Sequence, residues 1–299
     1  MKRRESKTAN NQTGRRMGRV EFKHISVSAR NPFAGWERIG VHALFVAFVA
    51  LLAVVCVRLR IPDFLLGAAH WPEGLLLVLA TATTLGSLSG QIPAQNVVLA
   101  ALVVAVIAGA VEVLGAITAI PFGPFVYNKA NIGPWLFYPL PWAVPVIWVV
   151  AILNARGVVR LILRRHRHAR NYGWWVMGLT VMLVVLFDLS LEPYATQVRE
   201  YWSWKPTKLA STWYTTPWVN SLGWTVTSLL ILLFVTPALI NKSPVKKPPT
   251  YHPLCVWQLL SLLFLIGTTL QSLWAASALI ATQMVLVLVL AWLGPRATK

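Results

Sequence analysis

Three carboxyl groups lie within long apolar stretches of the sequence, where charge is costly: Glu112, Asp188 and Glu192. Carboxylates inside a membrane-spanning helix are rare and usually face protein or water, so they mark candidate catalytic residues. Asp188 and Glu192 are four residues apart, which places both on one face of a helix. Burial and mutual repulsion should keep one of this pair protonated, and a neutral carboxylic acid beside an ionised carboxylate can perform acid–base chemistry.

The segments after these acids are rich in aromatic residues, proline and glycine. After Glu112 comes IPFGPFVYNKANIGPW, and after Glu192 comes PYATQVREYWSWKPTKLASTWYTTPWVNSLGW. Irregular backbone is tolerated at membrane depth only where it is buried or lines a cavity. We therefore expect both segments to cover a substrate pocket. Its expected residues are Phe122, Tyr127, Trp202, Trp204, Trp213, Tyr214, Asn220 and Trp224.

Each of these aromatic and polar residues also has a structural alternative. A single tryptophan could belong to the aromatic belt that forms at a membrane interface. Asn220 could position water or a carboxylate, or it could cap a helix or bond between helices.

The elements that must position these residues are apolar helices. Eight stretches are apolar and close to the 20 residues or so that span a bilayer. They are 40–59, 73–90, 96–118, 135–155, 172–193, 219–240, 254–274 and 276–293, of which the second is the most polar. The sequence predicts an all-α, polytopic integral membrane helix bundle over residues 39–294. We expect residues 1–38 to be a disordered basic cytosolic tail and residues 295–299 a cytosolic C-terminal tail.

The distribution of charge predicts the orientation of the bundle. The 299 residues include 27 lysines and arginines but only 9 aspartates and glutamates, a net charge of +18. The positive charges gather in residues 1–38, 156–170 and 242–247, each beside an apolar run. The positive-inside rule then predicts that both termini are cytosolic, which places all three carboxyl groups toward the outer face. This placement also argues against nucleic acid as a partner.

A structural role is the alternative for the three acids. They could pair with basic residues of the expected outer loops or accept hydrogen bonds from backbone amides at broken helix ends. Those basic residues are Lys129, Arg199, Lys205 and Lys208.

Several kinds of chemistry are excluded by missing motifs. No G-x-G-x-x-G follows a strand, which argues against redox chemistry with a dinucleotide. The six histidines are not clustered as the ligands of a di-iron oxygenase would be. The sequence also lacks the two acidic clusters with which a prenyltransferase binds a diphosphate through magnesium. No Ser/His/Asp or Cys/His group suggests a covalent nucleophile. Cofactor-free and metal-free proton chemistry on an apolar substrate remains, as does proton-coupled transport.

The order of the motifs resembles the carotenoid biosynthesis membrane protein family. Glu112 is followed by TAIPFGPFVY, then FDLSLEP, YWSW and WYTTPWVNSLGW, so the similarity covers about residues 112–224. The resemblance implies a hydratase of acyclic carotenoid ends that needs no cofactor. Its partners would be a linear, lycopene-like carotenoid, water, the bilayer and other carotenoid enzymes. The implied location is a bacterial or archaeal cell membrane, with the pocket toward the outer face.

Hydration of a terminal trisubstituted double bond fits the residues above. Glu112, Asp188 or Glu192 would donate the proton, aromatic faces would stabilise the tertiary cation, and an ionised carboxylate would take a proton from the attacking water. Three alternatives stay open: a proton-coupled lipid or isoprenoid transporter, a non-catalytic carotenoid-binding membrane protein, and isomerisation or cyclisation of the same end group.

Overall fold

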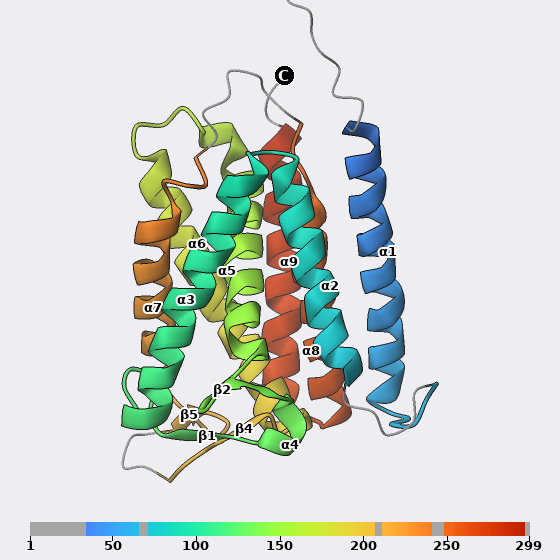
Figure 1. Cartoon of the computed structure of the whole chain (residues 1–299), viewed down its shortest axis with the longest axis vertical. Helices are drawn as coiled ribbons and strands as arrows, with labels where there is room; N and C mark the ends of the chain where they lie inside the picture. Colours follow the sequence, from blue (N-terminus) through green and yellow to red (C-terminus); the bar gives the residue numbers. More distant parts are fainter. Residues whose placement is uncertain (1–33, 66–70, 207–210, 241–247, 297–299) are drawn as a thin grey trace, which may run out of the picture. The chain divides into compact units, whose positions relative to one another are not determined.

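The fold is a bundle of long helices. The computed structural model describes residues 34–65, 71–206, 211–240 and 248–296, so the expected tail of residues 1–38 lies almost wholly outside the described residues. From Gly35 onward, the helices belong to one unit (Figure 1). The long helices are α1 (Ala34–Arg58), α2 (Trp71–Ser89), α3 (Ala94–Thr118), α5 (Ala143–Ile162), α6 (Tyr172–Pro193), α7 (Val219–Val235), α8 (His252–Leu270) and α9 (Trp274–Arg296).

The predicted all-α polytopic membrane bundle is confirmed. Six of the described helices, α1, α3, α5, α6, α8 and α9, are long and apolar enough to cross a membrane. Helix α7 is apolar but has 17 residues, and α2 is not among the six, in keeping with its more polar sequence. Eight crossings with both termini inside the cell therefore stay a prediction.

The helix predicted for residues 135–155 begins later than the sequence pattern indicates. Residues 135–141 form an antiparallel hairpin, in which β2 (Trp135–Phe137) pairs with β3 (Leu140–Pro141), and α5 starts at Ala143. Pro139 and Pro141 explain the difference, because proline lacks an N–H donor and disfavours helical backbone in the residue before it.

Helix α5 lies at the centre of the bundle. It packs against α2, α3, α6, α8 and α9, and most of its side chains are buried. The amide Nδ2 of Asn154 donates to the Val150 carbonyl at 2.8 Å and to Thr84 Oγ1 on α2 at 3.0 Å. A helix buried on all sides needs apolar residues all around, with its few polar groups paired internally.

Short strands gather at one end of the bundle, at the bottom of Figure 1. Strand β1 (Phe125–Tyr127) pairs antiparallel with β4 (Trp202–Trp204), and β5 (Ser211–Trp213) pairs with β6 (Thr216–Pro217). The short helix α4 (Lys129–Ile132) follows β1. In the first ribbon, Phe125 faces Trp204, Val126 faces Ser203 and Tyr127 faces Trp202. Two segments about 75 residues apart in sequence are thereby joined.

Helix α6 ends in an irregular turn, and a side chain bonds the backbone carbonyl that this turn leaves without a donor. Pro193 has no N–H to donate to the carbonyl of Leu189, four residues earlier, and a π-helical turn follows over Tyr194–Val198. The indole Nε1 of Trp213 donates to that carbonyl at 2.8 Å. The proline places Glu192 at the helix end, and the β5 strand supplies the donor that the proline removes.

We expect Trp213→Phe to lower the apparent melting temperature of the detergent-solubilised protein, because a carbonyl left without a donor costs about 1–3 kcal/mol. Trp218→Phe is the matched control, since Trp218 is half exposed. The loss should shrink when Pro193→Ala restores a backbone N–H. An equal loss in both backgrounds would contradict this account.

Candidate active site

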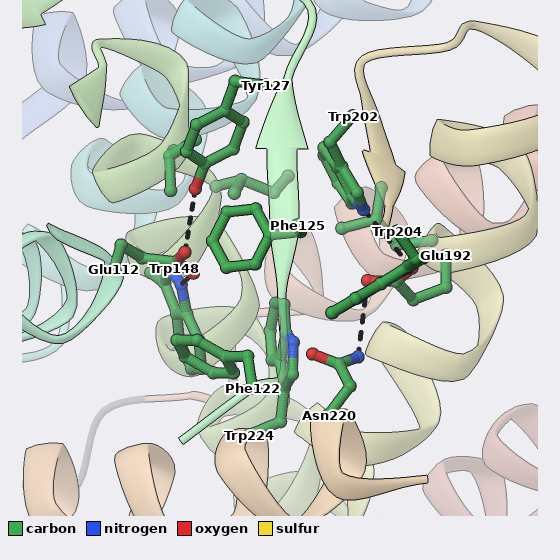
Figure 2. A pocket seen from close by; sticks show the side chains of 13 residues that line it. Glu112, Phe122, Phe125, Tyr127, Trp148, Glu192, Trp202, Trp204, Asn220 and Trp224 are labelled. Atoms are coloured by element: carbon green, nitrogen blue, oxygen red, sulfur yellow. Dashed lines mark hydrogen bonds between the residues drawn. The ribbon is translucent and has the colours of Figure 1, made fainter. Parts of the chain in front are cut away.

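A small cavity of about 40 Å³ lies where α3, α5, α6 and α7 meet the β1–β4 ribbon (Figure 2). Eight of the predicted site residues line it: Glu112, Phe122, Tyr127, Glu192, Trp202, Trp204, Asn220 and Trp224. Phe125, Trp148, Val144, Ile147 and Leu191 complete the lining. Glu112 and Glu192 lie on opposite sides of the cavity, with Phe125 between them.

Glu112 is buried on α3 and bonded through both carboxyl oxygens. Its Oε1 accepts a hydrogen bond from the indole Nε1 of Trp148 on α5, at 2.8 Å. Its Oε2 accepts one from the hydroxyl of Tyr127 on β1, also at 2.8 Å. Two neutral groups, one from a helix and one from a strand, therefore fix the orientation of this carboxyl group.

Glu192 is buried at the end of α6 and accepts more hydrogen bonds than Glu112 does. Its Oε2 accepts hydrogen bonds from the indoles of Trp204 at 3.0 Å and Trp202 at 3.3 Å, and from Thr216 Oγ1 at 2.9 Å. Its Oε1 accepts from the amide Nδ2 of Asn220, at 3.3 Å. The β4 and β6 strands thus supply three of its four donors.

Asp188 lies one turn earlier on α6 and does not line the cavity. Both of its carboxyl oxygens accept from the amide Nδ2 of Asn220 at 3.1 Å, so this amide joins Asp188 to Glu192. Asp188 is completely buried, behind the amide that faces the cavity.

No lysine or arginine forms an ion pair with these three acids in the described part of the chain. The recorded ion pair joins Arg199 to Glu73 on α2. Lys129 and Lys205 are exposed, and Lys208 lies outside the described residues. The ion pairs proposed as a structural alternative are thus absent for Lys129, Arg199 and Lys205.

The β1–β4 ribbon presents its aromatic side chains to one face because side chains alternate along a strand. Phe125 and Trp204 face each other with ring centroids 5.6 Å apart, and Tyr127 and Trp202 do so at 6.4 Å. Val126, between the two aromatic residues of β1, is exposed on the other face. Burial, and then the charge of Glu112, raise the pKa of Tyr127 well above its ordinary value, so this phenol keeps its proton.

A second aromatic pair and a glycine slot complete the wall. Trp148 on α5 stacks on Trp224 of α7, with ring centroids 3.9 Å apart and planes inclined by 19°. The ring of Phe122 fits between α3 and α7, where a Cβ added to Gly115 or Gly223 would lie 2.7 or 2.6 Å from it. Both positions lack room for any side chain, which fixes the Phe122 ring at the cavity.

Residues 73–291 match the family model described as carotenoid biosynthesis protein. The chain belongs to this family. A curated relative, the bisanhydrobacterioruberin hydratase of Haloarcula japonica, is 32% identical over 125 residues, which covers 42% of this chain and 40% of the relative. The aligned region is therefore less than half of the relative's length. No solved structure matches the chain.

Two residues predicted for the pocket of this carotenoid biosynthesis protein lie elsewhere. Trp213 bonds the Leu189 carbonyl, and the hydroxyl of Tyr214 accepts a hydrogen bond from the backbone N–H of Ala276, at 3.0 Å. Both instead join the β5 region to helices. Their aromatic composition alone did not distinguish these roles.

Six cavity or carboxylate contacts were not predicted: Phe125, Val144, Ile147, Trp148, Leu191 and Thr216. Alternation could have indicated Phe125, because FVY and WSW both place an aromatic residue at every second position. Trp148 is a tryptophan within an apolar stretch, which suggests an internal donor. Nothing in the sequence near Thr216 signals its bond to Glu192.

We expect Gly223→Ala to destabilise the protein by about 1–3 kcal/mol, because the new methyl group would displace the Phe122 ring. Adding Phe122→Leu should recover part of this loss. The measurement is the apparent melting temperature in detergent, with Gly178→Ala as control, since a Cβ at Gly178 meets nothing within 4 Å. If the Gly223→Ala protein is as stable as this control, Gly223 is not needed to make room for the Phe122 ring.

Proposed function

We propose that this protein adds water to the terminal double bond of an acyclic carotenoid to give a tertiary alcohol. Family membership and the name of the curated relative support carotenoid hydration. The observation on which the proposal chiefly depends is the pair of buried carboxyl groups, Glu112 and Glu192, on opposite sides of one small aromatic cavity. An acid and a base are what hydration needs.

The hydrogen bonds of Glu192 favour its ionised form. Its Oε2 is bonded by the indoles of Trp202 and Trp204, and an indole N–H can donate but never accept. A proton on Oε2 could bond the Thr216 hydroxyl, which accepts as well as donates, but it would still face the two indole donors. Hydrogen bonds to the charged form of a carboxylate stabilise it, so we assign Glu192 as the base that activates water.

Glu112 has one oxygen that can hold a proton. Its Oε1 faces the indole of Trp148, which cannot accept a hydrogen bond, but its Oε2 faces the hydroxyl of Tyr127, which can both donate and accept. A proton on Oε2 therefore keeps its partner when the hydroxyl turns. We assign Glu112 as the acid and Tyr127 as the group that positions its proton.

The proposed reaction adds one proton and one hydroxyl group. The Glu112 proton would bond to the less substituted alkene carbon, leaving a tertiary cation on the other. Water would attack that carbon while Glu192 takes a water proton, and proton exchange with solvent would restore both carboxyl groups. Aromatic faces, among them Phe122 and Trp224, would each stabilise the cation by about 0.5–2 kcal/mol.

Asp188 has a supporting part in this proposal. It does not line the cavity, but its two oxygens hold the Asn220 amide whose Nδ2 also bonds Glu192. We assign Asp188 as a positioning residue that fixes Asn220.

We expect Glu112→Gln and Glu192→Gln each to lower hydration at least 100-fold, since a positioned acid or base contributes about 10²–10⁴-fold. The assay is liquid chromatography with mass spectrometry of pigments from a lycopene-accumulating host that expresses the full chain. Glu200→Gln is the matched control, because Glu200 is exposed. Product should be heavier than the substrate by one water.

Incubating membranes that contain the protein with unlabelled lycopene in D₂O separates the alternatives. Hydration leaves one carbon-bound deuterium together with a new hydroxyl group, whereas isomerisation leaves deuterium without added oxygen. Unchanged pigment that stays bound to the inserted protein would favour a binding role. Unchanged pigment without binding, for a longer acyclic carotenoid as well, would reject the proposal in favour of transport.

We expect Tyr127→Phe to reduce hydration about 10- to 100-fold, less than Glu112→Gln, because the acid keeps its proton but loses the group that orients it. The rate with saturating substrate should fall more than pigment binding does. Val126→Ala, a change on the exposed face of the same strand, is the control. Full activity of Tyr127→Phe would remove the hydroxyl from the proton path.

A further inference from the structure

A second cavity, of about 630 Å³, adjoins the catalytic one. It lies between the first two turns of α2, the start of α5, the Leu260–Phe264 part of α8 and the π-helical turn after α6. Binding pockets for small molecules are commonly about 300–1,000 Å³ and mostly apolar. The cavity therefore has the size of a binding site, and the proposed reaction alone does not explain it.

The two cavities share a wall. Val144, Ile147, Leu191 and Trp202 line both of them. A single layer of side chains therefore separates the large cavity from the carboxyl groups of Glu112 and Glu192. A ligand long enough to pass this layer could occupy both spaces.

The volume of the catalytic cavity limits which part of the substrate it can hold. A water molecule needs about 10–15 Å³ of cavity volume. The catalytic cavity of about 40 Å³ therefore has room for roughly three waters but not for a polyene. The proposed substrate has a C30 to C50 hydrocarbon chain. Its body must lie outside the catalytic cavity while its end group reacts there.

The large cavity offers a surface that suits hydrocarbon. Leu76, Leu260, Leu263 and Phe264 are buried and line it. Of the polar groups that also line it, Tyr201 and Glu73 bond each other, and the buried hydroxyl of Tyr194 has no hydrogen-bond partner among the described residues.

The rim is held by an ion pair and its neighbours. Glu73 pairs with Arg199 and also accepts a hydrogen bond from the Tyr201 hydroxyl. Burial alone would lower the pKa of the Arg199 guanidinium. The charge of Glu73 nevertheless holds this pKa above its ordinary range. Asn131 Nδ2 donates to the backbone carbonyls of Arg199 and Glu200, at 3.1 and 3.3 Å.

The large cavity opens beside exposed side chains of α2. Trp71, Leu75 and Val78 line the cavity and are also 54%, 39% and 45% exposed on the outer surface of the bundle. Residues that belong both to a cavity and to a lipid-facing surface mark an opening toward the membrane. An insoluble polyene dissolved in the bilayer could enter there.

We propose that this cavity binds the polyene body of the carotenoid, with the end group passing Ile147 and Trp202 to reach the carboxyl groups. This assignment rests on the proposed hydration for the position of the end group. The polyene enters from the bilayer past Trp71, Leu75 and Val78 on α2.

The test fills the cavity without touching the catalytic one. Leu263→Trp places an indole in the large cavity, and Leu270→Trp, at the exposed end of the same helix, is the matched control. Leu260→Phe is a milder second variant, used should Leu263→Trp fail to insert. The full chain is assayed for lycopene retained through purification, by absorbance, and for hydration of lycopene and of a C10 acyclic isoprenoid with the same end group.

We expect Leu263→Trp to reduce lycopene retention at least 10-fold and to lower the lycopene-to-C10 rate ratio at least 10-fold, whereas Leu270→Trp leaves both unchanged. Unaltered retention and an unaltered ratio in both cavity variants would overturn the proposal. If the wild-type protein hydrates neither substrate but retains lycopene, and Leu263→Trp abolishes that retention, hydration fails and the cavity assignment stands.

Discussion

Buried carboxyl groups held by neutral donors are the constraint on which the rest of this structure depends. A carboxylate paired with a buried cation is held in its charged form, because losing that charge would strand the partner. Glu73, unlike the acids of the site, is paired with a cation, the partly exposed Arg199. Glu112 and Glu192 instead bond indoles, hydroxyls and an amide. The hydroxyls among these partners can turn when a proton arrives, and no buried cation is left unpaired when the carboxyl group loses its charge.

Neutral donors at the right positions require irregular backbone around the helix ends. A single helix face cannot surround a carboxyl group, so the donors come from β1, β4 and β6 as well as from α5 and α7. Pro193 ends α6 directly after Glu192 and frees the chain to turn toward these strands. The freed carbonyl is then bonded by Trp213, so the polar backbone near the site is not left unpaired.

The helices and the acids could be predicted because their signals are local and strong. An acidic residue in an apolar stretch stands out in any sequence, and apolar length alone locates most helices. The roles of the tryptophans could not be predicted in this way, since composition does not reveal which indole meets which acceptor. Trp148 reaches Glu112 from a helix 36 residues later, while Trp213 serves a backbone carbonyl. Such contacts depend on tertiary packing, which only the fold provides.

The contrast between the two cavities bears on the direction of the proposed reaction. Addition of water to an alkene is reversible, and a hydrocarbon environment poor in water favours the alkene. A site for hydration must therefore admit water at the reacting carbon while keeping it from the rest of the chain. A cavity of about 40 Å³ that is lined by two carboxyl groups, beside a mostly apolar one of about 630 Å³, meets this need, because the small cavity has room for about three waters and the large one offers mainly hydrocarbon surface. The shared wall of Val144, Ile147, Leu191 and Trp202 is then the boundary between water and polyene, and its apolar side chains keep the two solvents apart.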